Sequence, residues 1–173
     1  MYCINLKTVY FIRHAKSSWK EPYLSDYQRP LNQRGLRDAP VMAEKFYDSG
    51  ARPQLWICSS SQRTRQTCQF FKYQFEKAIN PMLPVITHSD QLYHGSIEDY
   101  FSVISKVGDQ NTSLVLFGHN FTITDLANLY SNQPIENVPT CGIVTLDFKM
   151  EYWSDIKNTP GSVRDFIYPK LYK

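Results

Sequence analysis

Short apolar runs alternate along this chain with stretches of helical periodicity. Three continuous apolar runs, at residues 8–12, 55–58 and 114–117, predict strands that are buried on both faces. A fourth run at 143–148 alternates apolar and polar positions, which predicts an edge or half-exposed strand. A weaker strand is predicted at 84–88.

A first helix is predicted between the first two strands. Its apolar positions recur at helical spacing, at Ala39, Met42, Ala43, Phe46 and Tyr47. The start is open to two interpretations: Asn32 caps a helix that Pro40 kinks, or the helix begins near Asp38. The Ser49-Gly50 pair predicts its end.

Three further helices follow. The second has its periodic positions at Thr64, Cys68, Phe71, Phe75 and Ile79. The third follows Ser96, which forms a capping-box pattern with Asp99, and the fourth follows Asn120. The apolar face of the fourth helix consists of Ile123, Leu126, Ala127 and Tyr130. This alternation predicts an α/β fold, a three-layer α/β/α sandwich with a mostly parallel central sheet, formed by residues 1–173 as a single domain.

Composition excludes several classes of protein. The net charge is only +3 and the basic residues are scattered, so we expect no nucleic-acid partner. No apolar run approaches the ~20 residues of a membrane helix, and no secretory signal is expected, which predicts a cytoplasmic protein. Four separated cysteines are predicted to be reduced thiols and not a zinc site: Cys3, Cys58, Cys68 and Cys141.

Polar side chains follow three of the predicted strands at the point where each strand ends. Arg13-His14 follows the first, the segment S-S-S-Q-R-T-R-Q-T follows the second, and Gly118-His119-Asn120 follows the third. Because ligands of open α/β sheets bind at the carboxyl ends of the strands, we expect these groups to converge. Guanidiniums and a helix N-terminus are typical of an anion site, and a neutral histidine is a competent nucleophile at phosphorus.

An ordered set of motifs extends this interpretation to a family. The motifs are F-I-R-H-A-K-S-S-W, D-Y-Q-R-P-L-N-Q-R-G, S-S-S-Q-R-T-R-Q-T, L-Y-H-G-S, L-F-G-H-N and P-T-C-G-I-V-T-L. Together they resemble the histidine phosphatase (phosphoglycerate mutase-like) superfamily, and within it the short SixA-type branch of phosphohistidine phosphatases. The resemblance runs from about residue 8 to the C-terminus. It implies a phosphoglycerate mutase-like fold.

The resemblance assigns expected roles to particular residues. It implies that His14 is the nucleophile, that Arg13 and Arg63 bind the phosphoryl group, and that His119 holds and neutralises it. Asp26 and Arg29 match the D-x-x-R-P-L motif and are expected to line the entrance.

Three features limit the assignment of roles. His94 is open between a structural and a site-lining role. The glutamate general acid of the mutases lies in an insertion that this chain lacks, so the leaving group could be protonated by Asp26, His94 or water. The family commonly has Pro-Gly after G-H-N, where this chain has Phe121-Thr122, and Ala where it has Thr64.

The sequence therefore predicts a metal-independent, cofactor-free phosphohydrolase with a phosphohistidine intermediate at His14. The expected substrates are phosphorylated protein side chains such as phosphohistidine. A small-molecule phosphomonoesterase and a non-catalytic phospho-ligand binding module are the alternatives, and a mutase is disfavoured because its insertions are absent. Cys58 and Arg63 resemble a cysteine-phosphatase loop, but four residues separate them where that loop has five.

Overall fold

A single six-stranded sheet organises the computed structural model, which describes residues 5–78 and 85–172. The strand order is β3-β2-β4-β1-β5-β6. The strands are β1 Leu6–Arg13, β2 Leu55–Ser59, β3 Ile86–Ser89, β4 Ser113–Gly118, β5 Ile143–Lys149 and β6 Gly161–Ile167. The pairs β3-β2, β2-β4 and β4-β1 are parallel, whereas β5 is antiparallel to both of its neighbours. The mostly parallel sheet is confirmed.

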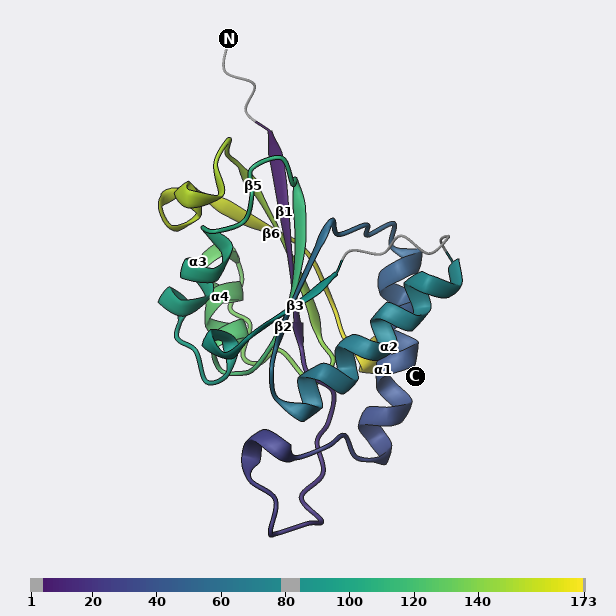
Figure 1. The fold of residues 1–173 in the computed structure, drawn as a ribbon. Coiled ribbons are helices and arrows are strands. Elements are labelled where there is room, and N and C mark those ends of the chain that lie inside the picture. Colours follow the sequence, from purple (N-terminus) through teal and green to yellow (C-terminus); the bar gives the residue numbers. More distant parts are fainter. Residues whose placement is uncertain (1–4, 79–84, 173) are drawn as a thin grey trace.

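Helices cover both faces of the sheet (Figure 1). One face carries α1 Gln33–Asp48 and α2 Gln62–Ala78, and the other carries α3 Ile97–Ile104 and α4 Thr122–Tyr130. Each face has its own core of buried apolar side chains, with Phe46 and Phe71 on the α1/α2 face and Phe101 and Leu126 on the α3/α4 face. The predicted three-layer sandwich is confirmed.

The start of α1 is fixed to the loop that follows β1. The Asn32 side chain accepts a hydrogen bond from the Gly35 amide at 3.0 Å, and the Asn32 amide donates to the Lys16 carbonyl at 2.9 Å. A Cβ at Gly35 would lie 2.3 Å from that carbonyl oxygen, so only glycine permits the close approach. The helix continues through Pro40 and ends at Asp48, so the earlier of the two predicted starts is correct.

The other predicted helix boundaries agree with the structure. α3 begins with the capping box of Ser96 and Asp99, and α4 begins two residues after Asn120. Ile79, Pro84 and Cys3 lie outside the described residues. Among the described cysteines, Cys58, Cys68 and Cys141 are free and buried.

The predicted position of residues 143–148 at an edge is wrong. β5 pairs with β1 on one side and with β6 on the other, and most of its residues are buried. Its polar positions are satisfied by neighbouring strands rather than by solvent: the Asp147 carboxylate accepts hydrogen bonds from Thr8 at 2.7 Å and from Arg164 at 3.2 Å. The edge strand on this side of the sheet is β6, which the sequence analysis did not predict.

No helix in the described part of the chain is long and apolar enough to cross a membrane.

Candidate active site

The predicted convergence of strand ends is present in the structure. β1, β2 and β4 run parallel, so their carboxyl ends lie at one edge of the sheet. The register pairs Arg13 with Gly118, and the amide of His14 donates to the carbonyl of Gly118 at 3.0 Å. His14 and His119, the residues that follow these strands, have ring centroids 5.1 Å apart. Arg63 lies between them in the first turn of α2.

His14 is held in one tautomer. Its Nδ1 lies 2.8 Å from the carbonyl oxygen of Ala15, which can only accept, so Nδ1 carries the proton and Nε2 carries the lone pair. Arg63 donates from Nε to that lone pair at 3.2 Å. Burial lowers the pKa of His14 to about 3, and the positive charges of Arg63 and Arg13 also lower it. His14 is therefore a neutral imidazole at physiological pH.

His119 takes the opposite tautomer. Arg63 donates from Nη2 to Nδ1 at 3.3 Å, so the proton of His119 lies on Nε2, which is 2.8 Å from Ser59 Oγ. Burial lowers the pKa of His119 to about 2, and the neighbouring His14 and Arg63 add to the effect. The hydroxyl of Tyr100 accepts the backbone amide of His119 at 3.1 Å. A Cβ at Gly118 would lie 2.0 Å from that hydroxyl oxygen, so glycine is required before His119.

Arg63 is the central group of the site. Besides the two imidazoles, its guanidinium binds Asp26 twice, through the backbone carbonyl and through Oδ2 at 2.9 Å. Thr67, one turn later on α2, donates to the Arg63 carbonyl at 2.7 Å and accepts the Ala15 amide at 3.0 Å. These bonds connect the start of α2 to the residue after His14, so Arg63 and His14 are positioned together.

Arg13 lies at the border of this cluster. Its Nη1 donates to the Val138 carbonyl at 2.7 Å and to the Asn137 side chain at 3.2 Å. Its Nε is buried and has no hydrogen-bond partner among the described residues. Burial, and then the nearby charge of Arg34, lower the pKa of Arg13. Arg13 therefore has a donor left over for a ligand, and burial at this point strengthens the interaction of that donor with an anion.

Asp26 connects the loop after β1 to the strand-end cluster. Its carboxylate accepts hydrogen bonds from Arg63, from Arg29 and from the Tyr93 hydroxyl, each at 2.9 Å. Burial raises the pKa of Asp26, but the Tyr93 hydroxyl and the two guanidiniums outweigh burial, and the net shift is downward. The Asp26 carboxyl group is therefore held ionised.

Arg29 lies behind Asp26 with all three of its donor nitrogens bound. Its Nε donates to the Ser18 carbonyl at 2.8 Å, Nη2 donates to Ser17 Oγ at 2.9 Å, and Nη1 binds Asp26. The guanidinium also lies 3.1 Å from the centroid of the Trp19 ring. The structure thus places Arg29 as the support of the loop that carries Asp26.

His94 lies at the mouth of the site. Its ring packs against Tyr93 in a tilted arrangement with centroids 4.1 Å apart, and lies 6.2 Å from the ring of His119. Its Nε2 is 3.5 Å from Asp26 Oδ2, and 65% of the side chain is exposed. Of the three predicted site histidines, all in the described part of the chain, His94 is exposed to solvent, whereas His14 and His119 are buried.

Several contributing residues were missed by the sequence analysis. Ser59 binds His119, Tyr93 binds Asp26, Thr67 supports Arg63 and Tyr100 supports His119. Ser59 ends β2, and Tyr93 precedes His94 in L-Y-H-G-S, so both stand in quoted motifs without any pattern that assigns them a contact.

The cysteine-phosphatase alternative does not fit the geometry. The Cys58 thiol is buried and donates to the carbonyl of Ser59 at 3.2 Å. Burial, together with the neighbouring Cys68 thiol, raises the pKa of Cys58, which opposes formation of a nucleophilic thiolate.

Comparison with known proteins identifies a matching family model and several relatives. A family model of the histidine phosphatase superfamily (branch 1) matches residues 9–89. An uncharacterised chloroplastic protein of Arabidopsis thaliana is 29% identical over 148 residues, which span 83% of this chain and 67% of that protein. An uncharacterised protein of Mycobacterium tuberculosis is 25% identical over 169 residues, or 92% of this chain and 100% of the relative.

Two solved structures extend the likeness to three dimensions. A candidate phosphohistidine phosphatase SixA from Agrobacterium tumefaciens matches with a TM-score of 0.76 at 27% identity, over 94% of this chain and 99% of that one. The protein histidine phosphatase SixA, in a structure complexed with tungstate, matches with a TM-score of 0.77 at 16% identity, which shows a common fold. Its match covers 96% of this chain and 99% of that chain. The protein therefore resembles the histidine phosphatase superfamily, and its SixA-type branch in particular, which supports a phosphatase function.

Proposed function

We propose that this phosphatase removes phosphoryl groups from protein side chains, phosphohistidine in particular, by way of a phosphohistidine intermediate on His14. The observation that carries the proposal is the state of His14. Its Nδ1 proton is committed to the Ala15 carbonyl, and its Nε2 lone pair faces Arg63 inside the cluster. A neutral imidazole is the form that attacks phosphorus, and the Nε2 lone pair becomes free when Arg63 exchanges its hydrogen bond to His14 for one to a phosphoryl oxygen.

The first step transfers the phosphoryl group to His14. A bond forms between Nε2 and phosphorus while the bond from phosphorus to the leaving group breaks, and the leaving group takes up a proton. Arg63 and Arg13 bind the equatorial oxygens, where negative charge is spread in the transition state. His119 contributes from the adjacent strand end. In the second step water attacks phosphorus, inorganic phosphate leaves and neutral His14 is regenerated.

We assign the protonation of the leaving group to His94. Asp26 is a poor acid because three hydrogen-bond donors hold its carboxylate in the ionised form. His94 lies beside that carboxylate and is exposed, so it can take protons from solvent and deliver them at the mouth of the site. A phosphohistidine needs this help less than an alkyl ester, since its imidazole leaves as a much weaker base than an alkoxide.

The proposed reaction needs no metal ion, because two guanidiniums provide the positive charge around the phosphoryl group. In the described part of the chain, no group of three or more His, Cys, Asp or Glu side chains could hold a metal. Metal independence is tested directly by adding a chelator to the assay.

A protein substrate is favoured by the surroundings of the mouth. Trp19 stacks on Arg29 and is 74% exposed, and Phe121, two residues after His119, is 79% exposed. Exposed aromatic side chains beside an active site are typical of contact with a macromolecule. The predictions of a single domain and of a cytoplasmic location stay predictions.

The decisive experiment compares wild type with His14→Ala on p-nitrophenyl phosphate and on a phosphohistidine peptide, both with chelator present. We expect turnover by wild type and a loss of at least about 10³-fold in the variant. His88→Ala is the matched control, because His88 is an exposed histidine of β3 away from the cluster.

The outcomes separate the alternatives. Equal rates for wild type and His14→Ala would remove His14 from the mechanism. Peptide binding without turnover by wild type would favour the non-catalytic binding module, and turnover of the aryl phosphate alone would favour a small-molecule phosphomonoesterase. Wild type quenched with alkaline detergent should retain phosphate on a histidine, since the intermediate is covalent and its N–P bond survives base but not acid.

A further inference from the structure

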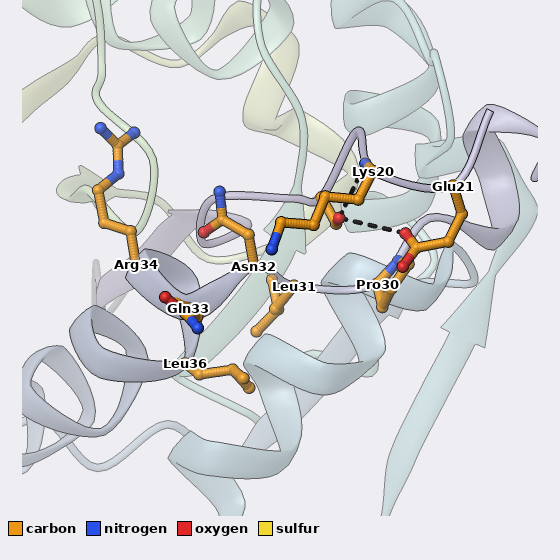
Figure 2. Close-up of a pocket in the computed structure, with 9 residues that line it drawn as sticks. Lys20, Glu21, Pro30, Leu31, Asn32, Gln33, Arg34 and Leu36 are labelled. Carbon is orange, nitrogen blue, oxygen red and sulfur yellow. Dashed lines mark hydrogen bonds between the residues drawn. The ribbon is translucent and has the colours of Figure 1, made fainter.

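We infer that Arg34 and Lys20 form a second anion-binding subsite next to the active site, which binds acidic side chains of a phosphorylated polypeptide. The inference rests on the proposed function and adds a substrate preference to it. The subsite is a cavity of about 440 Å³ between the loop after β1 and the first turn of α1 (Figure 2). Its lining includes Ser18, Lys20, Glu21, Asn32 and Arg34.

Hydrogen bonds connect the walls of this cavity to residues beside the active site. Ser18, on one wall, accepts a hydrogen bond from Arg29, which binds Asp26. On the other wall, the Asn32 amide donates a hydrogen bond to the carbonyl of Lys16, which lies two residues after His14. A ligand in the cavity therefore lies against the same loop that positions Asp26 and Arg63.

Arg34 and Lys20 are cations without a carboxylate partner in the described part of the chain. Arg34 is exposed, and its guanidinium makes one long hydrogen bond, of 3.5 Å, to Thr140. Figure 2 shows the Lys20 side chain extended toward Asn32, while the neighbouring Glu21 accepts from Ser18 at 3.2 Å. Both positive charges are therefore available to a ligand.

Arg34 also lies close to the phosphate-binding side of the cluster. Arg13 binds the carbonyl of Val138, and Arg34 contacts Thr140, two residues further along the same segment. Two residues of extended chain span at most about 7 Å. The two guanidiniums repel each other, and the charge of Arg34 is one cause of the lowered pKa of Arg13. An anionic ligand that reaches both would relieve this repulsion.

A polypeptide fits the surface beyond Arg34 better than a small molecule does. A second cavity of about 350 Å³ lies between α1 and α2 and is lined by Leu36, Gln66, Gln69, Phe70 and Tyr73. Leu36 lines both cavities, so they adjoin. A chain that starts at the active site and passes Arg34 meets exposed apolar and aromatic side chains next, including Tyr73. We therefore expect acidic residues close to the phosphorylated side chain, followed by apolar residues.

The test uses two phosphohistidine peptides that differ only in Glu or Gln at positions within four residues of the phosphorylated histidine. We expect wild type to favour the acidic peptide roughly tenfold in kcat/KM at low salt, and less at high salt. The double variant Arg34→Gln, Lys20→Gln should reduce this ratio to below about twofold. Arg34→Glu should favour a Lys peptide instead. Arg37→Gln is the matched control, since Arg37 is an α1 arginine already paired with Asp38 at 2.9 Å.

Peptide affinities for His14→Ala, measured by fluorescence anisotropy, give the same comparison without turnover. This affinity measurement distinguishes failure of the subsite from failure of the proposed hydrolysis, because it depends on peptide binding and not on turnover. A wild type that cleaves and binds both peptides equally, or a double variant that keeps the full acidic preference, would overturn the inference. Loss of the preference in Arg37→Gln would also overturn it, because the effect would then be one of general surface charge.

Discussion

The active site has two halves that are built in different ways. His14, Arg63 and His119 lie at strand ends or in the first turn of the following helix, and each is nine-tenths or more buried. The other half consists of loop residues, Asp26 and His94, with 40% and 65% of their side chains exposed. The sheet positions the first half through backbone pairing, whereas side-chain hydrogen bonds hold the second half in place.

Because the two halves are held in different ways, we expect them to have different roles in the proposed reaction. In the proposed mechanism the buried half provides the groups that must stay fixed, namely the nucleophile and the side chains that bind the phosphoryl oxygens. The exposed half can exchange protons with solvent and can contact a substrate. Mutations in the two halves should therefore affect different quantities, and the effects should differ in size.

The largest contrast is expected between Arg63→Gln and Asp26→Asn. Arg63→Gln removes the donors to both imidazoles and to the phosphoryl group, so kcat/KM for p-nitrophenyl phosphate should fall roughly 10³-fold. Asp26→Asn keeps the shape of a loop group that only positions Arg63, and we expect a loss of roughly tenfold. Thermal unfolding followed by circular dichroism checks that both variants fold. Equal losses of kcat/KM in the two variants would contradict the proposed difference between the buried half and the loop half.

The second contrast concerns the leaving group. His94→Ala should reduce kcat/KM roughly 10²-fold for phenyl phosphate, whose leaving group is strongly basic. The loss should be less than about threefold for p-nitrophenyl phosphate, whose leaving group departs without a proton. A parallel assay of His88→Ala provides the control. If His94→Ala lowered both rates equally, His94 would be a binding or structural residue and not the proton donor.

The third prediction concerns stability and pH. The pKa of His14 falls from 6.5 to about 3 on folding, so below pH 6.5 the unfolded chain binds the additional proton. Stability is therefore lost as the pH falls from 6.5 toward 3. Between pH 6.5 and about pH 4.5, wild type should lose about 2 kcal/mol more unfolding free energy than His14→Asn, which does not titrate. Urea unfolding at both pH values measures this difference, and parallel pH profiles would show that His14 is not buried as described.

The smallest effect is expected at the Cys58 thiol. Cys58→Ser retains a donor for the Ser59 carbonyl, and Cys58 faces the α1/α2 core rather than the ligand. We expect kcat/KM to stay within about twofold of wild type. A loss of more than 10²-fold in a folded variant would revive the thiolate mechanism.

The sequence predicted the buried half well, for physical reasons. Arg13-His14 and Gly118-His119 each follow a continuous apolar run, and parallel strands bring their carboxyl ends together without any further information. The β5 prediction failed because alternation measures polarity and not exposure. Asp147 is polar but is satisfied by Thr8 and Arg164 from the adjacent strands.

The loop half could not be predicted to the same depth. The bond between Asp26 and Arg63 joins residues that are 37 positions apart, and the bond between Tyr93 and Asp26 joins residues that are 67 apart. Neither strand pairing nor helical periodicity fixes such contacts, because they depend on the path of two loops. The quoted motifs placed Asp26 and His94 near the site, but their partners became visible only in three dimensions.

The central place of β1 in the sheet has a consequence for biosynthesis. β1 is the first strand made, yet its neighbours β4 and β5 begin at Ser113 and Ile143. A nascent chain therefore exposes His14 well before the strands that flank β1 have left the ribosome. The cluster of His14, Arg63 and His119 therefore forms only after β4 has been made, so ribosome-bound fragments that end before Ser113 should lack the proposed activity.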